Sequence, residues 1–515
     1  MEVFEIVIAL LLGGTVLAAI ARRIATPYPA LVAIAGAALA LFPHVPSLTL
    51  DPQLVLALFV APVLLDAAFD ASQRDLRANW RVVTSLAIGA VVLTVIVVAI
   101  VARALVSGLP WAAAIALGAI VAPPDAAAAT AVLRQLRPPN RLLVILEGES
   151  LFNDASALLI YRFAVGAMMT GLVSAWAFGA TLVAVSAGSL VLGLVLARIV
   201  SFVFPRIHDI ATAVIVQFCS TFGVWLLAER LHLSGILTTV VFAMALSRTS
   251  AQTTTARVRV PSYAVWEVAV FVLNVLAFIL VGFQLRQIVE RTDWTRYIGV
   301  AAAVCVAVIV ARLVWVSGAA FISRWRCRPR GDDRETPRDV VALSGRAAYV
   351  VGWCGMRGTV TLAAALALPA NFPFRDLIFF TSFAVVLVTL VVQGMTLRPL
   401  IAWLDVRDDG TVAREVQLAR VEALRAALDA VRHCGGGEDA ELLRRRYELR
   451  LRHAEQDGDE EGHELDERVI RIATTAERQR LVELRDNGTI GDTAFQRVEQ
   501  ELDLRELDLL QMAET

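Results

Sequence analysis

Long apolar stretches, separated by short breaks that contain Gly, Pro or Arg, dominate the chain up to about residue 403. A membrane-spanning helix needs about 20 mostly apolar residues. Thirteen windows of that kind can be distinguished, with cores near residues 3–21, 28–43, 54–71, 81–106, 110–134, 142–170, 174–204, 209–229, 232–248, 263–287, 296–323, 341–368 and 376–403. The pattern predicts an all-α membrane protein of about 13 transmembrane helices.

The pattern changes after residue 403, where Arg, Glu and Asp become dense. Apolar residues still recur there at helical spacing, which predicts soluble helices rather than further spans. The expected helices cover residues 411–433, 438–456, 464–486 and 492–513. We therefore predict two domains, a transmembrane domain over 1–403 and a helical tail over 404–515, the tail being a candidate binding site for a cytoplasmic regulator.

Arginines are distributed unequally between the loops that join the apolar windows. Loops after odd-numbered windows carry most of them, and the largest cluster runs from Arg324 to Arg346. Because cytoplasmic loops are enriched in Arg and Lys, this alternation places the N-terminus outside and the C-terminus, with its charged tail, in the cytoplasm. The first apolar window has no basic leader before it, so we expect a retained helix and not a cleaved signal peptide.

Composition agrees with a chain whose solvent is the lipid bilayer. Hydrophobic residues make up 57% of the 515 positions, and the mean hydropathy is +0.66. The net charge of −1 provides no basic surface of the kind that nucleic acid requires, so a nucleic-acid partner is excluded and membrane lipids are expected instead. The five cysteines lack CxxC spacing, which argues against a disulfide framework or a zinc site.

Carboxylates inside the apolar windows are the first candidates for chemistry, because a charge at the bilayer centre costs about 2.5–3.5 kcal/mol on insertion scales. Asp125 and Asp154 lie in consecutive windows, and the turn at Pro138-Pro139 begins 13 residues after the first and ends 15 residues before the second. Antiparallel packing therefore brings both to a similar depth. Ser150 shares a helix face with Asp154, four residues away.

Two windows are interrupted in the middle. Pro123-Pro124 precedes Asp125 in the fifth window, and the glycine-rich stretch Gly352–Gly358 lies in the twelfth. Proline removes amide donors, and the carbonyls that it frees need partners or water in the membrane. We expect windows 1–6 and 8–13 to form two inverted repeats in which broken helices 5 and 12 cross, since paired interruptions mark a transporter's binding site.

Two further charges lie within apolar windows. Arg312 of window 11 is expected to neutralise Glu149, and such a pair is structural because it leaves no free carboxylate for proton exchange. Asp154 follows a neutral Asn153 and is the better candidate for exchange. Asp66 of window 3 is open between a functional and a structural role.

The chain resembles the monovalent cation:proton antiporter-1 family of sodium/proton exchangers, in its bacterial form. The densest match is GAIVAPPDAAAATAVLRQLRPPNRLLVILEGESLFNDASALLIYRF, from Gly118 to Phe163. Further matches follow in order: LHLSGIL from Leu231, WEVAVFVLN from Trp266, GMRGTVTLAAAL from Gly355 and QGMTLRPL from Gln393. The tail segment RQRLVELRDNGTIGDTAFQRVEQELDL is similar to tails of the bacterial branch.

The resemblance implies a thirteen-helix homodimer in the bacterial inner membrane that takes part in pH homeostasis, with a core that carries the site and a part that forms the dimer. It implies cation and proton binding by Asp125, Ser150 and Asp154, with a transported monovalent Na⁺ as the bound metal and no cofactor. Asp66 takes the place of a family glutamate near the cytoplasmic funnel. The residues implied to be structural at the site are Asn153, Glu149, Arg312 and Arg357. Pro124 stands where the family has a threonine, so that ligand is missing here.

The hypothesis is that one cation and one proton compete for Asp154 in a partly desolvated site. A single exchanging carboxylate predicts electroneutral exchange of one H⁺ for one Na⁺. K⁺ or another monovalent cation in place of Na⁺ is the alternative within antiporters. From other classes we weigh a cation channel and an intramembrane aspartyl enzyme; the latter is disfavoured because the nearest GxGD-like string, from Gly488, lies in the tail.

Overall fold

The computed structural model describes most of the chain. The described residues are 2–23, 28–40, 54, 56–136, 138–170, 175–291, 294–326, 345–369, 371–406, 408, 410–433, 438–455, 475–477, 479–484, 487, 498 and 502. These residues form helices, turns and short connections, without a strand among them. The chain divides into two compact units, Met1–Asp408 and Asp409–Thr515.

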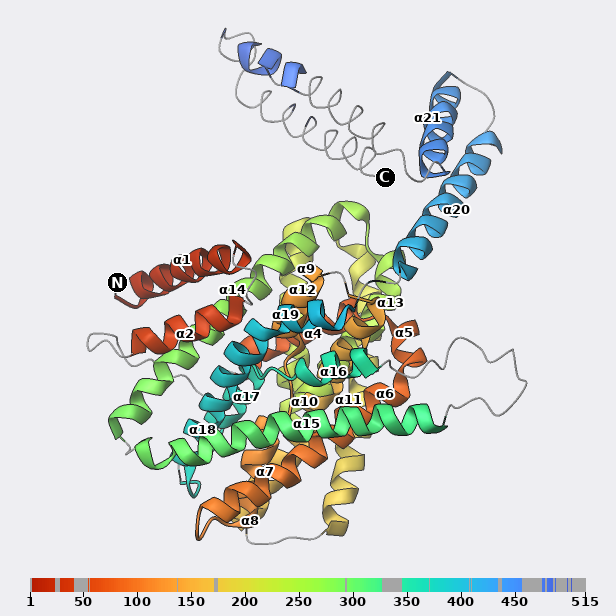
Figure 1. Cartoon of the computed structure of the whole chain (residues 1–515). Helices are drawn as coiled ribbons and strands as arrows, with labels where there is room; N and C mark the ends of the chain where they lie inside the picture. The colour runs from red at the N-terminus through yellow and green to blue at the C-terminus, as the bar shows by residue number, and fades with distance from the viewer. Residues whose placement is uncertain are drawn as a thin grey trace. The chain divides into compact units, whose positions relative to one another are not determined.

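The first unit is a bundle of helices (Figure 1). In chain order they are α1 (Glu2–Arg23), α2 (Tyr28–Ala40), η1 (Leu56–Val60), α4 (Ala61–Asp70), α5 (Gln73–Ala78), α6 (Trp80–Thr84), η2 (Ser85–Ala90), α7 (Val91–Leu105), α8 (Trp111–Val121), α9 (Ala126–Leu136), α10 (Asn140–Thr170), α11 (Ala175–Val203), η3 (Phe204–Arg206), α12 (Ile210–Arg230), α13 (Gly235–Thr253), α14 (Ala256–Arg291), η4 (Trp294–Arg296), α15 (Ile298–Arg326), α16 (Gly345–Trp353), α17 (Thr359–Leu366), α18 (Arg375–Val388), η6 (Thr389–Gln393) and α19 (Gly394–Leu404). Each of the thirteen apolar windows overlaps at least one of these helices. The predicted all-helical class is confirmed for the described residues, while residues 41–43 of the second window lie outside them.

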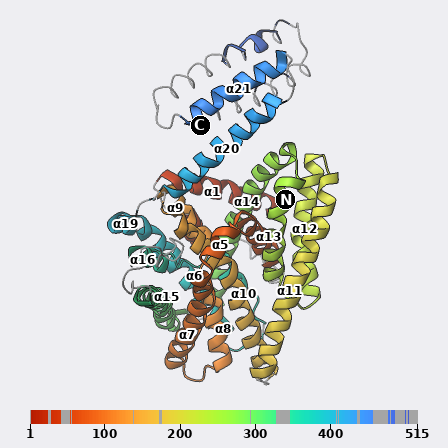
Figure 2. The ribbon, with the colours of Figure 1, turned by 90° about the vertical axis from the view of Figure 1, so that its right-hand side faces the viewer.

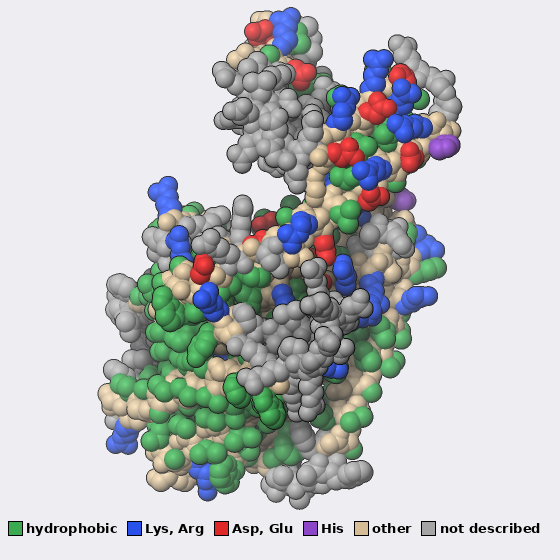
Figure 3. All heavy atoms as spheres, turned by 45° about the vertical axis from the view of Figure 1, so that its right-hand side comes forward, with side chains coloured by type: hydrophobic (Ala, Val, Ile, Leu, Met, Phe, Trp, Pro, Cys, Tyr) green, Lys and Arg blue, Asp and Glu red, His purple; other side chains and the backbone are tan. Residues whose placement is uncertain are grey.

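Six stretches of the described chain are long and apolar enough to cross a membrane by themselves. They are Trp80–Leu105, Gly179–Arg206, Ile210–Arg230, Arg257–Ala277, Ile298–Ile322 and Arg375–Leu404. The windows that hold α8 with α9 and α16 with α17 are not among them, because each is split into short helices. Hydrophobic side chains cover much of the described surface of this unit (Figure 3), as expected for a surface in contact with lipid.

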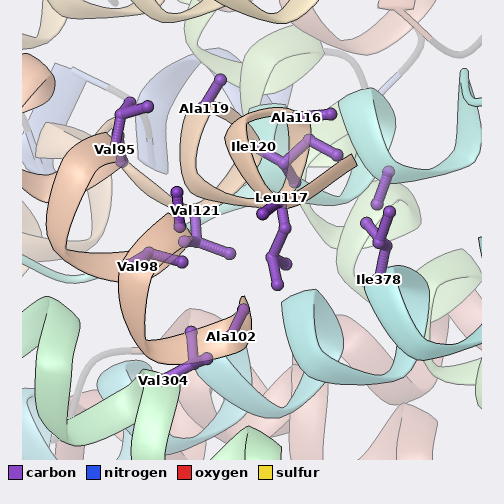
Figure 4. Close-up of a cluster of buried hydrophobic side chains, with 14 of the residues drawn as sticks. Val95, Val98, Ala102, Ala116, Leu117, Ala119, Ile120, Val121, Val304 and Ile378 are labelled. Atoms are coloured by element: carbon purple, nitrogen blue, oxygen red, sulfur yellow. The ribbon is translucent and has the colours of Figure 1, made fainter. Parts of the chain in front are cut away.

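Small residues let α7 and α8 pack closely and so fix the end of α8. Figure 4 shows Val95 and Val98 of α7 near Ala119 and Val121 of α8, all of them buried. A Cβ on Gly118 would lie 2.8 Å from the carbonyl oxygen of Val95, so a larger residue would separate the two helices. Close approach through small side chains is typical of helix pairs in membranes.

Two side chains from other helices bind the π-helical turn η2. In a π-helical turn the regular hydrogen-bond register shifts and backbone carbonyls become available. The Ser156 hydroxyl of α10 donates to the Ala87 carbonyl at 2.6 Å, and Trp315 Nε1 of α15 donates to the Ser85 carbonyl at 3.1 Å. The first bond holds α10, which carries the candidate site residues, against η2, and the second holds α15 there.

The second unit contains α20 (Thr411–His433) and α21 (Glu438–Glu455), which lie side by side (Figure 2). Arg425 of α20 forms ion pairs with Glu422 at 2.8 Å and with Glu455 of α21 at 2.7 Å. The bounds agree closely with the first two predicted tail helices. The other two, 464–486 and 492–513, lie mostly outside the described residues. Among those that are described, Leu481 and Leu502 form a small buried cluster.

Candidate functional site

The two mid-window breaks meet in space. The first separates α8 from α9 at residues 122–125, and the second separates α16 from α17 at residues 354–358. The backbone N–H of Asp125 in the first break donates to the carbonyl of Met356 in the second, with a nitrogen–oxygen distance of 2.6 Å. The main chain of one break is therefore bonded directly to the main chain of the other.

Arg357 satisfies the carbonyls at the C-terminal end of α8. Its Nε donates to the Val121 carbonyl at 2.9 Å and its Nη2 to the Ala122 carbonyl at 3.2 Å, while Nη1 bonds the Gly355 carbonyl. The last carbonyls of a helix lack partners and carry partial negative charge, so a fully buried guanidinium is well placed there. In an unbroken helix these two carbonyls would accept bonds from the amides of Asp125 and Ala126. Those amides donate instead to the Met356 carbonyl and the Ser150 hydroxyl, and Arg357 takes their place.

Arg312 satisfies the carbonyls at the C-terminal end of α16. It donates to the Val351 carbonyl at 3.0 Å and to the Gly352 carbonyl at 3.2 Å. The other edge of its guanidinium forms a two-pronged ion pair with Glu149, in which Nη2 lies 2.9 Å from Oε2. Both side chains are only 2% exposed. The pair is therefore a buried, fully occupied contact, as a structural role requires.

Asp125 and Asp154 interact electrostatically across the hairpin formed by α9 and α10. Asp154 is 4% exposed, whereas Asp125 and Ser150 are partly exposed. The Ser150 hydroxyl oxygen accepts a bond from the Ala126 N–H at 3.4 Å, at the first residue of α9. Two carboxylates and a hydroxyl thus lie around one junction between the first break and α10.

Gly358, directly before α17, packs against the Asp125 carboxylate. A Cβ at Gly358 would overlap Asp125 Oδ2 and would lie 2.7 Å from Asp125 Cβ. The absence of a side chain at 358 lets the carboxylate approach the N-terminal end of α17, where the helix dipole favours negative charge. The sequence analysis did not single out this glycine, although its place in the GMRG string of the second break was visible.

Asn153 joins α10 to the first break. Its Nδ2 donates to the Pro124 carbonyl at 3.3 Å, so it contacts the break as the resemblance implies for a residue that stabilises crossing helices. Its Oδ1 is buried and has no hydrogen-bond partner among the described residues. A buried acceptor of this kind normally has a donor, a water molecule or a cation beside it.

Asp66 lies in a different place, on the wall of an open cavity between α4, α12, α13 and α14. Neither Asp125 nor Asp154 lines that cavity. Trp266 is also on the wall, where its Nε1 donates to Gln217 Oε1 at 2.6 Å and its ring stacks on Phe218 at 4.5 Å. It is 6% exposed, so it is packed into the wall.

Tyr28 of α2 is a neighbour of the site that the sequence analysis missed. It interacts electrostatically with Asp125 and hydrogen-bonds to Asn274 of α14. Its ring centroid lies 5.6 Å from that of Phe271. A tyrosine near the end of an apolar window is usually an interfacial residue, so nothing in the local pattern distinguished it.

The described residues hold no group of three or more His, Cys, Asp or Glu that could bind a metal ion. The donors near Asp154 are instead one further carboxylate and neutral oxygens. Oxygen-bearing side chains around a cross-linked pair of broken helices, inside a bundle with apolar spans, are typical of one class of protein, the multi-pass membrane transporters.

The comparisons with known proteins identify the family. The family model described as "Sodium/hydrogen exchanger, transmembrane" matches residues 6–403, and the chain belongs to this family of monovalent cation:proton antiporters. Its members are transporters and not enzymes. The match covers every residue of the two breaks and of the site between them.

Individual relatives agree. An uncharacterized Na⁺/H⁺ exchanger of Mycobacterium tuberculosis is 31% identical over 99% of this chain and 96% of its own length. The low-affinity Na⁺/H⁺ antiporter NhaS1 of Synechocystis is 31% identical over 77% of this chain and 75% of its own. A sodium, potassium, lithium and rubidium/H⁺ antiporter of Bacillus pumilus is 27% identical over 89% and 70%.

Solved structures agree on the fold. The sodium proton antiporter MjNhaP1 of Methanocaldococcus jannaschii, at pH 8, matches with a TM-score of 0.59 over 76% of this chain and 99% of that chain. The sequence identity of that pair is 19%, so the likeness concerns the fold alone.

Proposed function

We propose that this chain exchanges Na⁺ for H⁺ with a 1:1 stoichiometry at a site formed by Asp125, Ser150 and Asp154. The observation that carries the proposal is the electrostatic interaction of Asp125 with Asp154 at the crossed breaks, where the Ser150 hydroxyl bonds the Ala126 amide next to Asp125. Sodium is named for the Mycobacterium, Synechocystis and Bacillus relatives alike.

The mechanism is competition for one negative charge. Asp154 is buried, and a buried carboxylate is best neutralised either by a proton or by a bound cation. When Na⁺ binds, carboxylate and hydroxyl oxygens replace part of its water shell, and the proton of Asp154 leaves. When the proton returns, Na⁺ loses its ligand. Because both occupants carry one positive charge, the complete cycle moves no net charge.

The remaining polar residues support the site in this proposal but do not bind the exchanged cation. Arg312 neutralises Glu149, and Arg357 caps α8, so neither arginine needs to change its charge in the cycle. Asn153 holds α10 to the Pro124 carbonyl and keeps Asp154 in position. Asp66 lies on the cavity wall and attracts cations toward the site.

The family resemblance supports the remaining architecture that we propose. The chain then has thirteen transmembrane helices in two inverted repeats, with the broken helices of each repeat crossing at the site. The N-terminus lies outside the bacterial inner membrane and the tail, residues 404–515, lies in the cytoplasm as a separate domain that binds a regulator. Two copies form a homodimer.

Exchange of K⁺ or of several monovalent cations is a second candidate. The Bacillus pumilus relative is named for sodium, potassium, lithium and rubidium. Pro124 precedes Asp125 here and has no hydroxyl, so the first break offers one fewer oxygen donor than the threonine of the resembling family would. A looser shell discriminates less by ion size.

Everted membrane vesicles with a pH dye separate these candidates. Exchange is followed after addition of Li⁺, Na⁺ or K⁺, with the membrane potential clamped at two values. We expect Na⁺-driven proton movement at the same rate at both potentials. A voltage-dependent rate would refute the 1:1 stoichiometry, and equal rates with K⁺ would establish the broader specificity.

The role of Asp154 itself is tested by Asp154→Asn, which keeps the size and polarity of the side chain but removes its charge. We expect this variant to fold, as judged by its detergent elution profile, and to show no cation-driven proton movement. A folded Asp154→Asn protein that still exchanged Na⁺ for H⁺ would remove Asp154 from the site. Ion current without coupled proton movement in the native protein would identify a channel instead.

A further inference from the structure

One ion pair ties the helix that carries Asp154 to two helices of the cavity wall. Arg162 Nη2 of α10 lies 2.6 Å from Glu229 Oε1, near the end of α12. The same oxygen accepts a bond at 3.4 Å from the N–H of Gly235, the first residue of α13. A single carboxylate therefore joins α10, α12 and α13 at one point.

This point lies at the opposite end of the helices from the cavity. On α12 the cavity is lined by Gln217 and Ser220, and Glu229 follows about 14 Å further along the helix. On α13 the cavity begins at Phe242, about 10 Å after Gly235. The cavity lining thus starts near the middle of both helices and reaches Thr254, past the far end of α13, while the ion pair lies at the other end.

The proposed binding site lies a short way along α10 from the ion pair. Arg162 is eight residues after Asp154 on α10, or about 12 Å along the helix axis. Leu158 lies halfway, four residues from each, so all three share one helix face. It is only partly exposed and packs against buried clusters on both sides of α10. The route from Asp154 toward the ion pair is therefore filled by side chains.

We propose that the Arg162–Glu229 pair is a latch that holds the site closed on the side away from the cavity. This inference rests on the proposed exchange, in which the site must open to each side in turn. When α10 moves away from α12 and α13, the pair breaks and the route past Leu158 opens. When the pair forms again, the site faces the cavity side only.

The exposure of the two side chains suits a contact that must break in every cycle. Arg162 is 47% exposed and Glu229 is 36% exposed, so water is available to both charges when they separate. Pairs of this kind change an equilibrium only a few-fold. The Glu149–Arg312 pair is 2% exposed on both sides, and breaking it would leave two dry charges.

Thiol labelling tests the latch independently of transport. A cysteine is introduced by Leu158→Cys, and a membrane-impermeant thiol reagent is added to intact cells, where the latch side is outside in the proposed topology. Modification at residue 158 is quantified by mass spectrometry of its peptide, so the native cysteines remain in place. We expect Arg162→Gln or Glu229→Gln to raise the labelling rate about threefold.

The charge-swapped pair, Arg162→Glu with Glu229→Arg, is expected to restore slow labelling. The control is Arg103→Gln, whose arginine bonds the Leu109 carbonyl at 2.7 Å and takes no part in the latch; it is expected to leave the rate unchanged. Labelling at the native rate in both single variants, or equally fast labelling in the swapped pair, would overturn the proposal. Vesicle exchange in the native protein is scored separately, so a failure of the exchange proposal would be recognised as such.

Discussion

The two breaks of the helical bundle are built from similar parts but carry opposite charges. The break between α8 and α9 contains Asp125, which is partly exposed, and the break between α16 and α17 contains Arg357, which is fully buried. At both breaks an arginine binds the carbonyls at the end of the preceding helix: Arg357 for α8 and Arg312 for α16.

The two breaks differ in which helix end carries the charge and in the sign of that charge. Cations occupy the C-terminal helix ends, where the helix dipole stabilises them permanently. Asp125 lies instead at an N-terminal helix end, beside Gly358, and interacts electrostatically with Asp154. Charges that hold the structure are dry and paired, while the charges proposed to exchange protons retain an accessible neighbour.

The largest effect is expected where the permanent charges are broken. Glu149→Gln would leave Arg312 buried without its counter-ion, which costs about 3–5 kcal/mol of folding stability. We expect a poorly folded protein in detergent, detected as a large drop in thermal unfolding temperature. A stable Glu149→Gln protein that had lost exchange would show instead that Glu149 takes part in exchange. The distinction between structural and exchanging charges would then fail.

A smaller loss is expected at the capping arginine of the first break. Arg357→Gln shortens the side chain and leaves the carbonyls of Val121 and Ala122 without donors, at a cost of about 2 kcal/mol. Thermal unfolding measures it. Arg357→Lys is the matched variant. It keeps the charge but loses the planar guanidinium that bonds two carbonyls at once, and we expect an intermediate stability. Native stability in both variants would show that the cap is dispensable.

Gly358→Ala sharpens the comparison without changing any charge. The added methyl group would displace the Asp125 carboxylate from the end of α17, and we expect the KM for Na⁺ to rise about tenfold, equivalent to about 1.4 kcal/mol. Gly318→Ala in α15 is the control, because no atom lies within 4 Å of a Cβ there. An unchanged KM in Gly358→Ala would separate Asp125 from cation binding.

The smallest effect is expected on removal of the Ser150 hydroxyl. Ser150→Ala removes one oxygen from the proposed shell and should raise the KM for Na⁺ about fivefold, while Ser150→Thr should restore it. Ser156→Ala is a matched control on the same helix, since its hydroxyl bonds the Ala87 carbonyl and lies outside the proposed shell. If both serine variants changed the KM equally, the effect would come from the position of α10 and not from a ligand.

The sequence predicted those parts of the molecule that depend on local pattern. The apolar windows located the helices, Pro123-Pro124 and Gly352–Gly358 located the breaks, and the pairing of Glu149 with Arg312 followed from the need to neutralise a buried arginine. Such features are visible because a charge, a proline or a glycine-rich stretch inside an apolar segment is costly in the membrane interior and can be seen in that segment alone.

Other contacts depend on which helices meet, and no local pattern contains that information. Tyr28 reaches Asp125 only because α2 packs against α14, and Arg162 meets Glu229 only because α10 lies beside α12 and α13. The close approach at Gly358 likewise requires the two breaks to cross. The assignment of Asp125, Ser150 and Asp154 as cation ligands stays a prediction until exchange is measured.

The hydrogen bond from the Asp125 amide to the Met356 carbonyl has a consequence for mutagenesis. Every residue except proline supplies the same amide, so a conventional substitution scan leaves this contact in place and registers nothing. Replacing the amide of residue 125 by an ester, through a hydroxy acid introduced at that position, would remove this backbone hydrogen bond between the two breaks and leave the Arg357 bonds to Val121 and Ala122 in place. Genetic variation alone therefore underestimates how firmly the crossing is held.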